Sequence, residues 1–294
     1  MKITLAKSAG FCFGVKRALN LARKLSLSEP GKIYILGDIV HNELVVKQIK
    51  KSGVKKIKRL KPGMGRILLI RAHGAGKKIY QTAKKLGYEI VDATCPKVRQ
   101  IHEIAREDEA SGYQIIIIGD KKHDEVNGIV GQLNQKALII SSYKNIPYKK
   151  LSTIGKASVV VQSTQNLENV LKIVEVLKRQ IKDLKFHNTI CQPTTVKQEE
   201  LKILPRQNDL MLVIGSKTSA NTKRLYQIAK ALNKKTYWIN SAKDLKKGWL
   251  KGIETIGVTA GASTPDSVTQ TVIQQIKNCL DFRSLSKKRA CGQA

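Results

Sequence analysis

The sequence predicts an α/β fold built from three related units with parallel sheets, and two observations indicate it. First, one order of apolar strand, glycine and polar loop occurs three times, in IYILGDIVHNE with Gly37, IIIIGDKKHDE with Gly119 and MLVIGSKTSAN with Gly215. Second, a cysteine precedes each glycine at nearly constant spacing, by 25 residues at Cys12 and by 24 at Cys95 and Cys191. Such repetition is typical of one supersecondary unit used several times.

Each cysteine opens a predicted helix. Apolar residues recur at helical spacing in GVKRALNLARKL after Cys12. Cys95 is followed by Pro96, which is favoured in a first helical turn, and Cys191 by QPTTVKQEELKIL. A second strand-end loop completes each unit, in ILLIRAHGAG with His73, VVVQSTQN with Ser163 and IGVTAGASTPD with Ser263. Because strands alternate with helices, we expect parallel sheets with ligand groups beyond the carboxyl ends of their strands.

The spacing divides the chain into units at 1–94, 95–190 and 191–275, with a C-terminal tail at 276–294 that has no counterpart in the repeat. If the units pack around a pseudo-threefold axis, their polar loops and cysteines face one central cavity.

Composition excludes several classes of protein. The 294 residues are 41% hydrophobic and 26% charged, which is ordinary for a globular chain. No apolar run is long enough to span a membrane, and Lys7 interrupts the region where a signal peptide would be apolar. The net charge of +32 attracts anionic partners, but 5% aromatic residues offer few platforms for nucleic-acid bases. We therefore expect a cytoplasmic protein that binds neither membrane nor nucleic acid. We also expect a monomer, which the composition itself does not determine.

Three cysteines at one repeat position predict a metal–sulfur site. The chain has no CxxC pair, which disfavours a zinc ribbon or finger. Three thiolates from distant segments suit a 4Fe–4S cluster with one iron open to substrate, and a zinc ion with three sulfurs and a water remains the alternative. Cys279 and Cys291 fall outside the spacing, and we expect neither to be a ligand.

Polar residues at the strand ends predict an anion site. Imidazole, hydroxyl and amide groups can hold phosphate oxygens without a P-loop, and the chain has no P-loop and no GxGxxG motif. The candidates share repeat positions: His41, His73, His123, Ser219, Asn221 and Ser263. His102 and His187 lie off these positions, so we expect structural roles for them.

Glu125 is the candidate for proton transfer. It lies two residues after His123 in a loop expected to face the metal–sulfur site. A partly desolvated carboxyl group near an anionic centre protonates more easily than one in water. Alternatively, it is a helix N-terminal carboxylate that only favours the helix dipole. Glu43 has the same repeat position and could instead stabilise its own loop.

Six motifs together resemble the family of 4-hydroxy-3-methylbut-2-enyl diphosphate reductases, the terminal enzymes of the non-mevalonate isoprenoid pathway. They occur in this order between residue 1 and about residue 275: GFCFGVKRA, AHG, DATCP, HDEVNG, GSKTSAN and VTAGAS. The resemblance implies a trefoil of three α/β domains around a central 4Fe–4S cluster. It also implies a reductive dehydroxylation by two electrons and two protons, which yields isopentenyl and dimethylallyl diphosphates.

The resemblance assigns roles to the candidate residues. Cys12, Cys95 and Cys191 would hold the cluster, and the substrate hydroxyl would bind the iron without a cysteine. The diphosphate would lie on His41, His73, His123, Ser219, Asn221 and Ser263. Glu125 would supply protons, and Ser163 would orient it and the alcohol. Flavodoxin or ferredoxin, both acidic, would deliver the electrons.

The chain departs from the family pattern at four places. Asp124 stands where the family usually has proline, Ser163 where threonine is common, and Ala220 where a second serine often lies. Gln192-Pro193 after the third cysteine is also unusual. Three alternatives stay open: a basic nucleic-acid-binding protein with zinc, a different iron–sulfur dehydratase, and a homologue that has lost activity.

Overall fold

The computed structural model describes the backbone of residues 1–291 and the side chains of residues 1–279, and it contains two compact units. The middle unit is Cys12–Thr195. The terminal unit joins Met1–Phe11 to the chain from Val196 onward. Each unit is built from parallel strands connected by helices.

The middle unit holds two four-stranded parallel sheets, with strand orders β3-β2-β4-β5 and β7-β6-β8-β9. The first sheet and its helices are α1 (Phe13–Ser28), β2 (Ile33–Leu36), α2 (Glu43–Lys51), β3 (Lys55–Ile57), β4 (Arg66–Ile70), α3 (Lys77–Lys85) and β5 (Tyr88–Asp92). The second sheet follows with α4 (Pro96–Ala110), β6 (Gln114–Ile118), α5 (Asp124–Val130), β7 (Leu138–Ile140), η1 (Tyr143–Asn145), α6 (Tyr148–Leu151), β8 (Lys156–Val161), α7 (Leu167–Gln180) and β9 (Asp183–Phe186). Helix α8 (Gln192–Ile203) contains the boundary between the units.

The terminal unit holds the third sheet, in the order β1-β12-β10-β11, again with parallel pairing throughout. Its elements are β1 (Lys2–Leu5), η2 (Leu204–Arg206), β10 (Leu210–Ile214), α9 (Ala220–Leu232), β11 (Thr236–Ile239), η3 (Ala242–Asp244), η4 (Lys247–Leu250), β12 (Thr255–Ala260) and α10 (Asp266–Cys291). The prediction of three α/β units with parallel sheets is confirmed.

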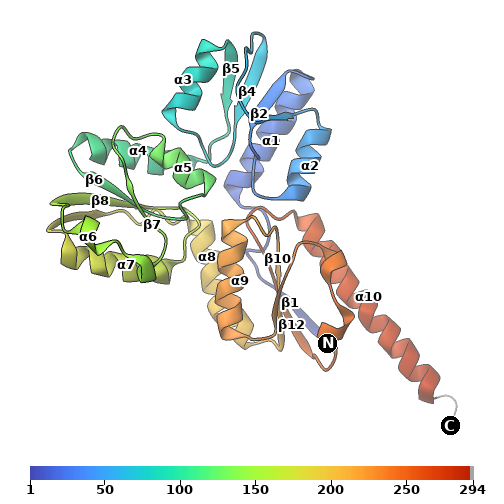
Figure 1. Cartoon of the computed structure of the whole chain (residues 1–294). Helices are drawn as coiled ribbons and strands as arrows, with labels where there is room; N and C mark the ends of the chain where they lie inside the picture. Colours follow the sequence, from blue (N-terminus) through green and yellow to red (C-terminus); the bar gives the residue numbers. More distant parts are fainter. Residues whose placement is uncertain (292–294) are drawn as a thin grey trace. The chain divides into compact units, whose positions relative to one another are not determined.

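The central strands are apolar on both faces because helices cover both faces of each sheet. In the second sheet, Ile116 and Val159 pack under α7, whereas Ile117 and Val160 pack under α4 and α5. Figure 1 shows this arrangement, with α4 and α5 on one side of β6 and β8 and α7 on the other. This double cover explains the continuous runs IIII and VVV, and it leaves the strand ends as the places for polar residues.

The N-terminal strand corrects one predicted boundary. Residues 1–94 were expected to form the first unit, but β1 pairs with β12 in the third sheet, with Lys2 opposite Thr255 and Leu5 opposite Val258. This pairing covers backbone groups of β12 that an open sheet edge would expose. The predicted tail at 276–294 also begins inside a longer element, because α10 starts at Asp266.

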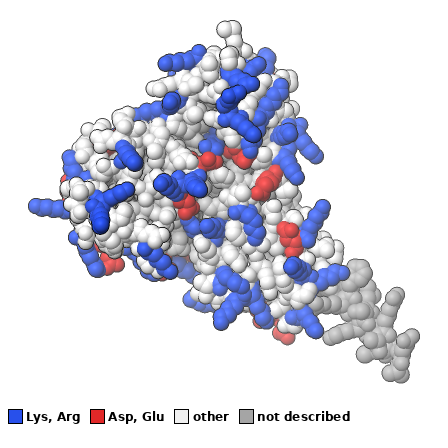
Figure 2. All heavy atoms as spheres, viewed as in Figure 1, with Lys and Arg blue, Asp and Glu red and all other residues white. Residues whose placement is uncertain are grey.

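The charged surface is dispersed. Figure 2 shows Lys and Arg scattered over the visible face rather than gathered in one stripe. Among the described residues, no helix combines the length and apolarity that crossing a membrane requires.

Candidate functional site

The three repeat-related cysteines all stand at helix N-termini of the middle unit. Cys12 is the N-cap of α1, Cys95 is the N-cap of α4, and Cys191 directly precedes α8. None is in a disulfide, and all are partly buried. Helix N-termini present free N–H groups and a positive dipole end, which favour thiolates and anionic metal–sulfur centres.

The sulfur atoms influence one another electrostatically. Burial raises the pKa of Cys95, against backbone hydrogen bonds from Lys97 and Val98, and the charge of Cys12 raises it further. Burial also raises the pKa of Cys191, and the charges of Glu125 and Cys12 add to this effect. Cys12 and Glu125 therefore act electrostatically on both Cys95 and Cys191.

Gly14 leaves open the space between two of these sulfurs. A Cβ at this position would stand 2.5 Å from the Cys95 sulfur and 4.0 Å from the Cys12 sulfur. A side chain there would therefore collide with the Cys95 thiol. Two thiols, those of Cys12 and Cys95, lie around the space that Gly14 leaves open, and the charge of Cys12 also acts on the thiol of Cys191. This arrangement fits a compact metal–sulfur group.

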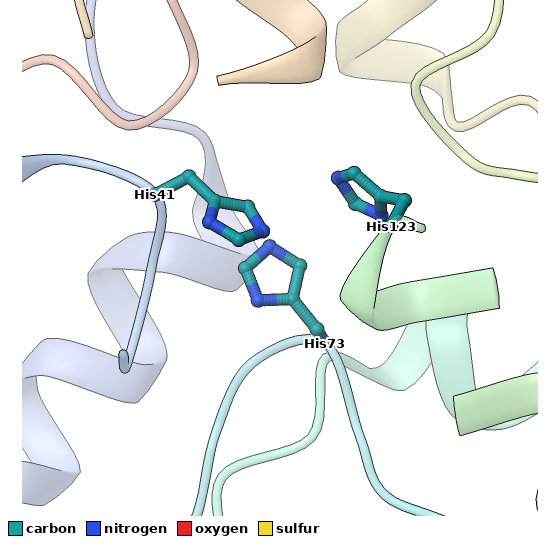
Figure 3. A group of neighbouring side chains, drawn as sticks. All are labelled: His41, His73 and His123. Carbon is teal, nitrogen blue, oxygen red and sulfur yellow. The ribbon is translucent and has the colours of Figure 1, made fainter. Parts of the chain in front are cut away.

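The three histidines also meet. His41, His73 and His123 follow β2, β4 and β6, and their rings converge in Figure 3. The ring centroids lie 4.4 Å apart for His41–His73, 5.1 Å for His41–His123 and 5.5 Å for His73–His123. One ligand atom from each ring lies within 4.8 Å of the others. We call these three residues the histidine cluster.

Burial lowers the pKa of two of these rings, which favours their neutral form. It is the largest cause that lowers the pKa of His41, and it holds the pKa of His73 well below its usual value, with neighbouring His41 and His123 lowering it further. His73 Nδ1 is buried and has no hydrogen-bond partner, which leaves it available to a ligand.

The histidine cluster is better suited to an anion than to a metal ion. His123 Nδ1 accepts the Glu125 N–H at 3.2 Å as the N-cap of α5. In the neutral ring, the proton then lies on Nε2, which becomes a donor. A donor is what a phosphate oxygen needs, whereas a metal ion needs the free lone pair.

Glu125 lies two residues after His123 and is buried, with 2% of its surface exposed, and its charge raises the pKa of Cys95 and Cys191. Its carboxylate accepts two hydrogen bonds from Ser163, from the backbone N–H at 2.5 Å and from Oγ at 2.7 Å. Burial raises the pKa of Glu125 to about 6, against both bonds from Ser163. The carboxyl group can therefore gain and lose a proton near neutral pH.

Asp124 brings a second carboxylate to the histidine cluster. Its Oδ2 accepts a hydrogen bond from Arg71 Nη1 at 2.6 Å and lies 3.5 Å from His41 Nε2. The sequence predictions did not include Arg71, although it precedes His73 by two residues at the same strand end. A basic residue at the end of a strand was the signal that could have identified it.

The remaining anion-site candidates belong to the terminal unit. Ser219 is the N-cap of α9, and its hydroxyl accepts the Thr222 N–H at 3.3 Å. The Asn221 side chain is 4% exposed, and neither of its amide atoms has a hydrogen-bond partner. Ser263 is also buried, at 7% exposed. An unsatisfied buried amide is unusual and favours a missing ligand, but the role of these three residues stays a prediction.

Other candidates have structural surroundings. His187 Nε2 lies 2.7 Å from Asp108 Oδ2, which also accepts the Ser158 hydroxyl at 2.7 Å. His102 is buried, and desolvation lowers its pKa to about 4. Cys279 packs against the core of the terminal unit.

Glu43 and Cys291 complete the sequence candidates. Glu43 is the first residue of α2, next to the capping residue Asn42. The side chain of Cys291 lies outside the described residues.

Comparisons with known proteins cover almost the whole chain. Residues 3–277 match the family described as LytB protein. The 4-hydroxy-3-methylbut-2-enyl diphosphate reductase of Caldanaerobacter subterraneus subsp. tengcongensis is 42% identical over 95% of this chain and 97% of the relative. The enzyme of the same name from Aquifex aeolicus is 37% identical over 97% and 99%.

Solved structures agree with these relatives. A structure of (E)-4-hydroxy-3-methyl-but-2-enyl diphosphate reductase, described as the terminal enzyme of the non-mevalonate pathway, has a TM-score of 0.69 at 37% identity. It covers 95% of this chain and 100% of the other. The E-1-hydroxy-2-methyl-but-2-enyl-4-diphosphate reductase from Plasmodium falciparum has a TM-score of 0.86 at 31% identity, over 93% and 87%.

Proposed function

Because the chain belongs to the LytB protein family, we propose that it reduces (E)-4-hydroxy-3-methylbut-2-enyl diphosphate to isopentenyl and dimethylallyl diphosphates. The C–O bond of the alcohol breaks, the oxygen leaves as water, and the allyl fragment takes up two electrons and a proton. One observation carries the proposal: three free cysteines, three histidines and a buried protonatable glutamate meet in one compact unit.

The cysteines would hold a 4Fe–4S cluster. Three thiols at helix N-termini and the open space at Gly14 fit such a group. When bound, the cluster supplies electrons and, at the iron without a cysteine, a Lewis acid for the substrate hydroxyl. Cys279 is held in the core of the terminal unit, so it is not proposed as a ligand.

The chain's own residues bind the diphosphate and move the proton. The histidine cluster provides donors for phosphate oxygens. Ser219, Asn221 and Ser263 keep the diphosphate-binding role that the family resemblance implies for them. Glu125 holds a proton on its carboxyl group and delivers it toward the leaving hydroxyl. Ser163 fixes the orientation of that carboxyl through two hydrogen bonds.

The test is turnover of the diphosphate alcohol by protein purified without oxygen, with a reduced viologen as electron source. We expect both isomeric diphosphates as products. Glu125→Gln should lower turnover by about 10²- to 10⁴-fold, the usual contribution of a positioned acid, and leave the iron content unchanged. Glu107→Gln removes an exposed carboxylate of α4 and serves as the matched control.

Two outcomes would contradict the assignments. Full turnover by Glu125→Gln would remove Glu125 as the proton donor. A Cys95→Ser variant that retains wild-type iron and sulfide would remove that cysteine from the cluster.

A further inference from the structure

A carboxylate that a site for anions does not need, that of Asp124, lies beside the histidine cluster. Asp124 Oδ2 accepts the Arg71 guanidinium at 2.6 Å and lies 3.5 Å from His41 Nε2. The Arg71 guanidinium is a cation that donates a hydrogen bond, and the His41 ring lies close enough for an electrostatic interaction with the carboxylate. The Asp124 carboxylate therefore occupies the kind of position that a phosphate oxygen would take.

The structure makes room for this contact. Gly37 has a φ of +85°, and a Cβ at this position would stand 2.7 Å from Arg71 Nη1. The guanidinium therefore passes close over the backbone of Gly37. The ion pair joins two loops, because Arg71 follows β4 of the first sheet and Asp124 begins α5 beside the second. Side chains of Arg71 and Asp124 are 20% and 24% exposed, so the pair is only partly screened by water.

A purely local role does not account for the geometry. An acidic residue in the first turn of α5 would favour the helix dipole without any partner. The Asp124 carboxylate instead accepts a hydrogen bond from Arg71 in one other loop and approaches the His41 ring in a second.

We propose that Asp124 is an internal competitor of the diphosphate, which occupies the Arg71 donor beside His41 and thereby weakens binding and speeds release of diphosphates. The inference rests on the proposed function of the histidine cluster. A bound diphosphate must draw Arg71 and His41 away from Asp124, and it then lies near a like charge. Substrate and products both carry the diphosphate, so weaker binding of this group speeds the departure of products.

The test measures the Kd of inorganic diphosphate by calorimetry on the cluster-loaded protein, at fixed ionic strength and without added metal. Asp124→Asn should bind about tenfold more tightly, which corresponds to about 1.4 kcal/mol. Its KM for the diphosphate alcohol should fall in parallel. Glu107→Gln also removes one negative charge and should match the wild type. Unchanged or weaker binding by Asp124→Asn would overturn the proposal.

A second substitution tests whether the gain of affinity comes from loss of the carboxylate and not from the new asparagine side chain. Asp124→Pro removes the carboxylate and suits the first position of α5, where no hydrogen bond from the Asp124 N–H is needed. It should also bind inorganic diphosphate more tightly. Damage to the fold would weaken binding, so a gain of affinity cannot come from misfolding.

The role of Arg71 is tested by a double-mutant cycle. Arg71→Gln should bind inorganic diphosphate more weakly, and adding Asp124→Asn to it should recover only a small part of the tenfold gain. A full tenfold gain in the absence of Arg71 would contradict competition for that donor.

The control for the proposed function is His73→Gln. If the wild type binds inorganic diphosphate and His73→Gln weakens it, the histidine cluster is the anion site, and unchanged binding by Asp124→Asn refutes only the competitor. If His73→Gln does not alter binding, the anion site itself is wrong.

Discussion

Removing the Ser163 hydroxyl should move the alkaline limit of activity to higher pH. The Glu125 carboxylate accepts a hydrogen bond from the Ser163 hydroxyl at 2.7 Å and another from the Ser163 backbone N–H at 2.5 Å. The Ser163→Ala substitution removes only the hydrogen bond from the hydroxyl. A hydrogen bond to a charged group contributes about 1.5–3 kcal/mol, and one pKa unit corresponds to about 1.4 kcal/mol. The pKa of Glu125, about 6 in the structure, should therefore rise by roughly one to two units.

The sign of the effect follows from the charge state. The hydroxyl stabilises the ionised carboxylate, so its loss favours the protonated form. If Glu125 acts as an acid, kcat/KM falls as pH rises through its pKa. The descending limb for Ser163→Ala should then lie roughly one to two pH units above that of the wild type. The plateau below it should be lower, because Glu125 is less well oriented.

The assay is kcat/KM between pH 5.5 and 9 with a reduced viologen as electron source. Ser163→Thr keeps the hydroxyl and should retain the wild-type limb, so it is the matched control. Both variants keep the three cysteines, so the charge of the cluster affects them equally. A limb that stays in place or moves to lower pH in Ser163→Ala would refute this account of Glu125.

Three further predictions concern the cluster, the stability and the electron donor. Gly14→Ala should abolish iron binding while circular dichroism stays that of the wild type, because its Cβ would stand 2.5 Å from the Cys95 sulfur; normal iron content would disprove the crowding. Asp108→Asn should lower the free energy of unfolding by about 2 kcal/mol at pH 7, since Ser158 and His187 lose a buried charged acceptor. Burial raises the pKa of Asp108, but hydrogen bonds from Ser158, Lys185 and His187 outweigh it and lower the pKa, so this stability exists above about pH 4 and is lost as pH falls below that. Denaturant titrations at pH 7 and pH 3.5 should show the difference shrink, and a constant difference would contradict the linkage. Added salt should slow reduction by an acidic protein donor more than it weakens substrate binding, because screening removes long-range steering; equal sensitivity with a neutral chemical donor would contradict this.

The repeat predicted the three sheets because its signal is long and internally checked. Each apolar strand ends at a glycine, and a cysteine precedes each glycine at almost the same distance. The N-terminal strand escaped this signal. Its four residues, KITL, pair with β12 more than 250 positions away, and nothing in the local pattern marks that partner.

The sequence identified individual residues of the candidate site more completely than it identified the contacts between them. Repeat positions identified His41, His73 and His123, which do meet. The two-bond contact of Glu125 with Ser163 depends on two loops 38 residues apart, and only the resemblance to a family suggested it. The Asp124–Arg71 pair depends on side-chain direction across two sheets, which spacing cannot give.

The buried side chain of Lys197 also could not be predicted from spacing in the sequence. Lys197 is 2% exposed, and its Nζ donates to the carbonyl oxygens of Gly10 at 3.1 Å and Ala260 at 3.2 Å, and to that of Ser8. A lysine in a helix that also carries Glu199 and Glu200 is normally a surface residue, so nothing in the local pattern singles out Lys197. Its position becomes understandable only once β1 is known to lie beside β12, where the carbonyl groups at the two strand ends need a donor.

The most direct test of the central claim is the iron and acid-labile sulfide content per chain, on protein purified without oxygen. About four of each would support a cluster held by Cys12, Cys95 and Cys191 with one open iron, and about three of each would indicate the same site after loss of the labile iron. Zinc without sulfide would contradict the account and favour a structural metal in a basic binding protein.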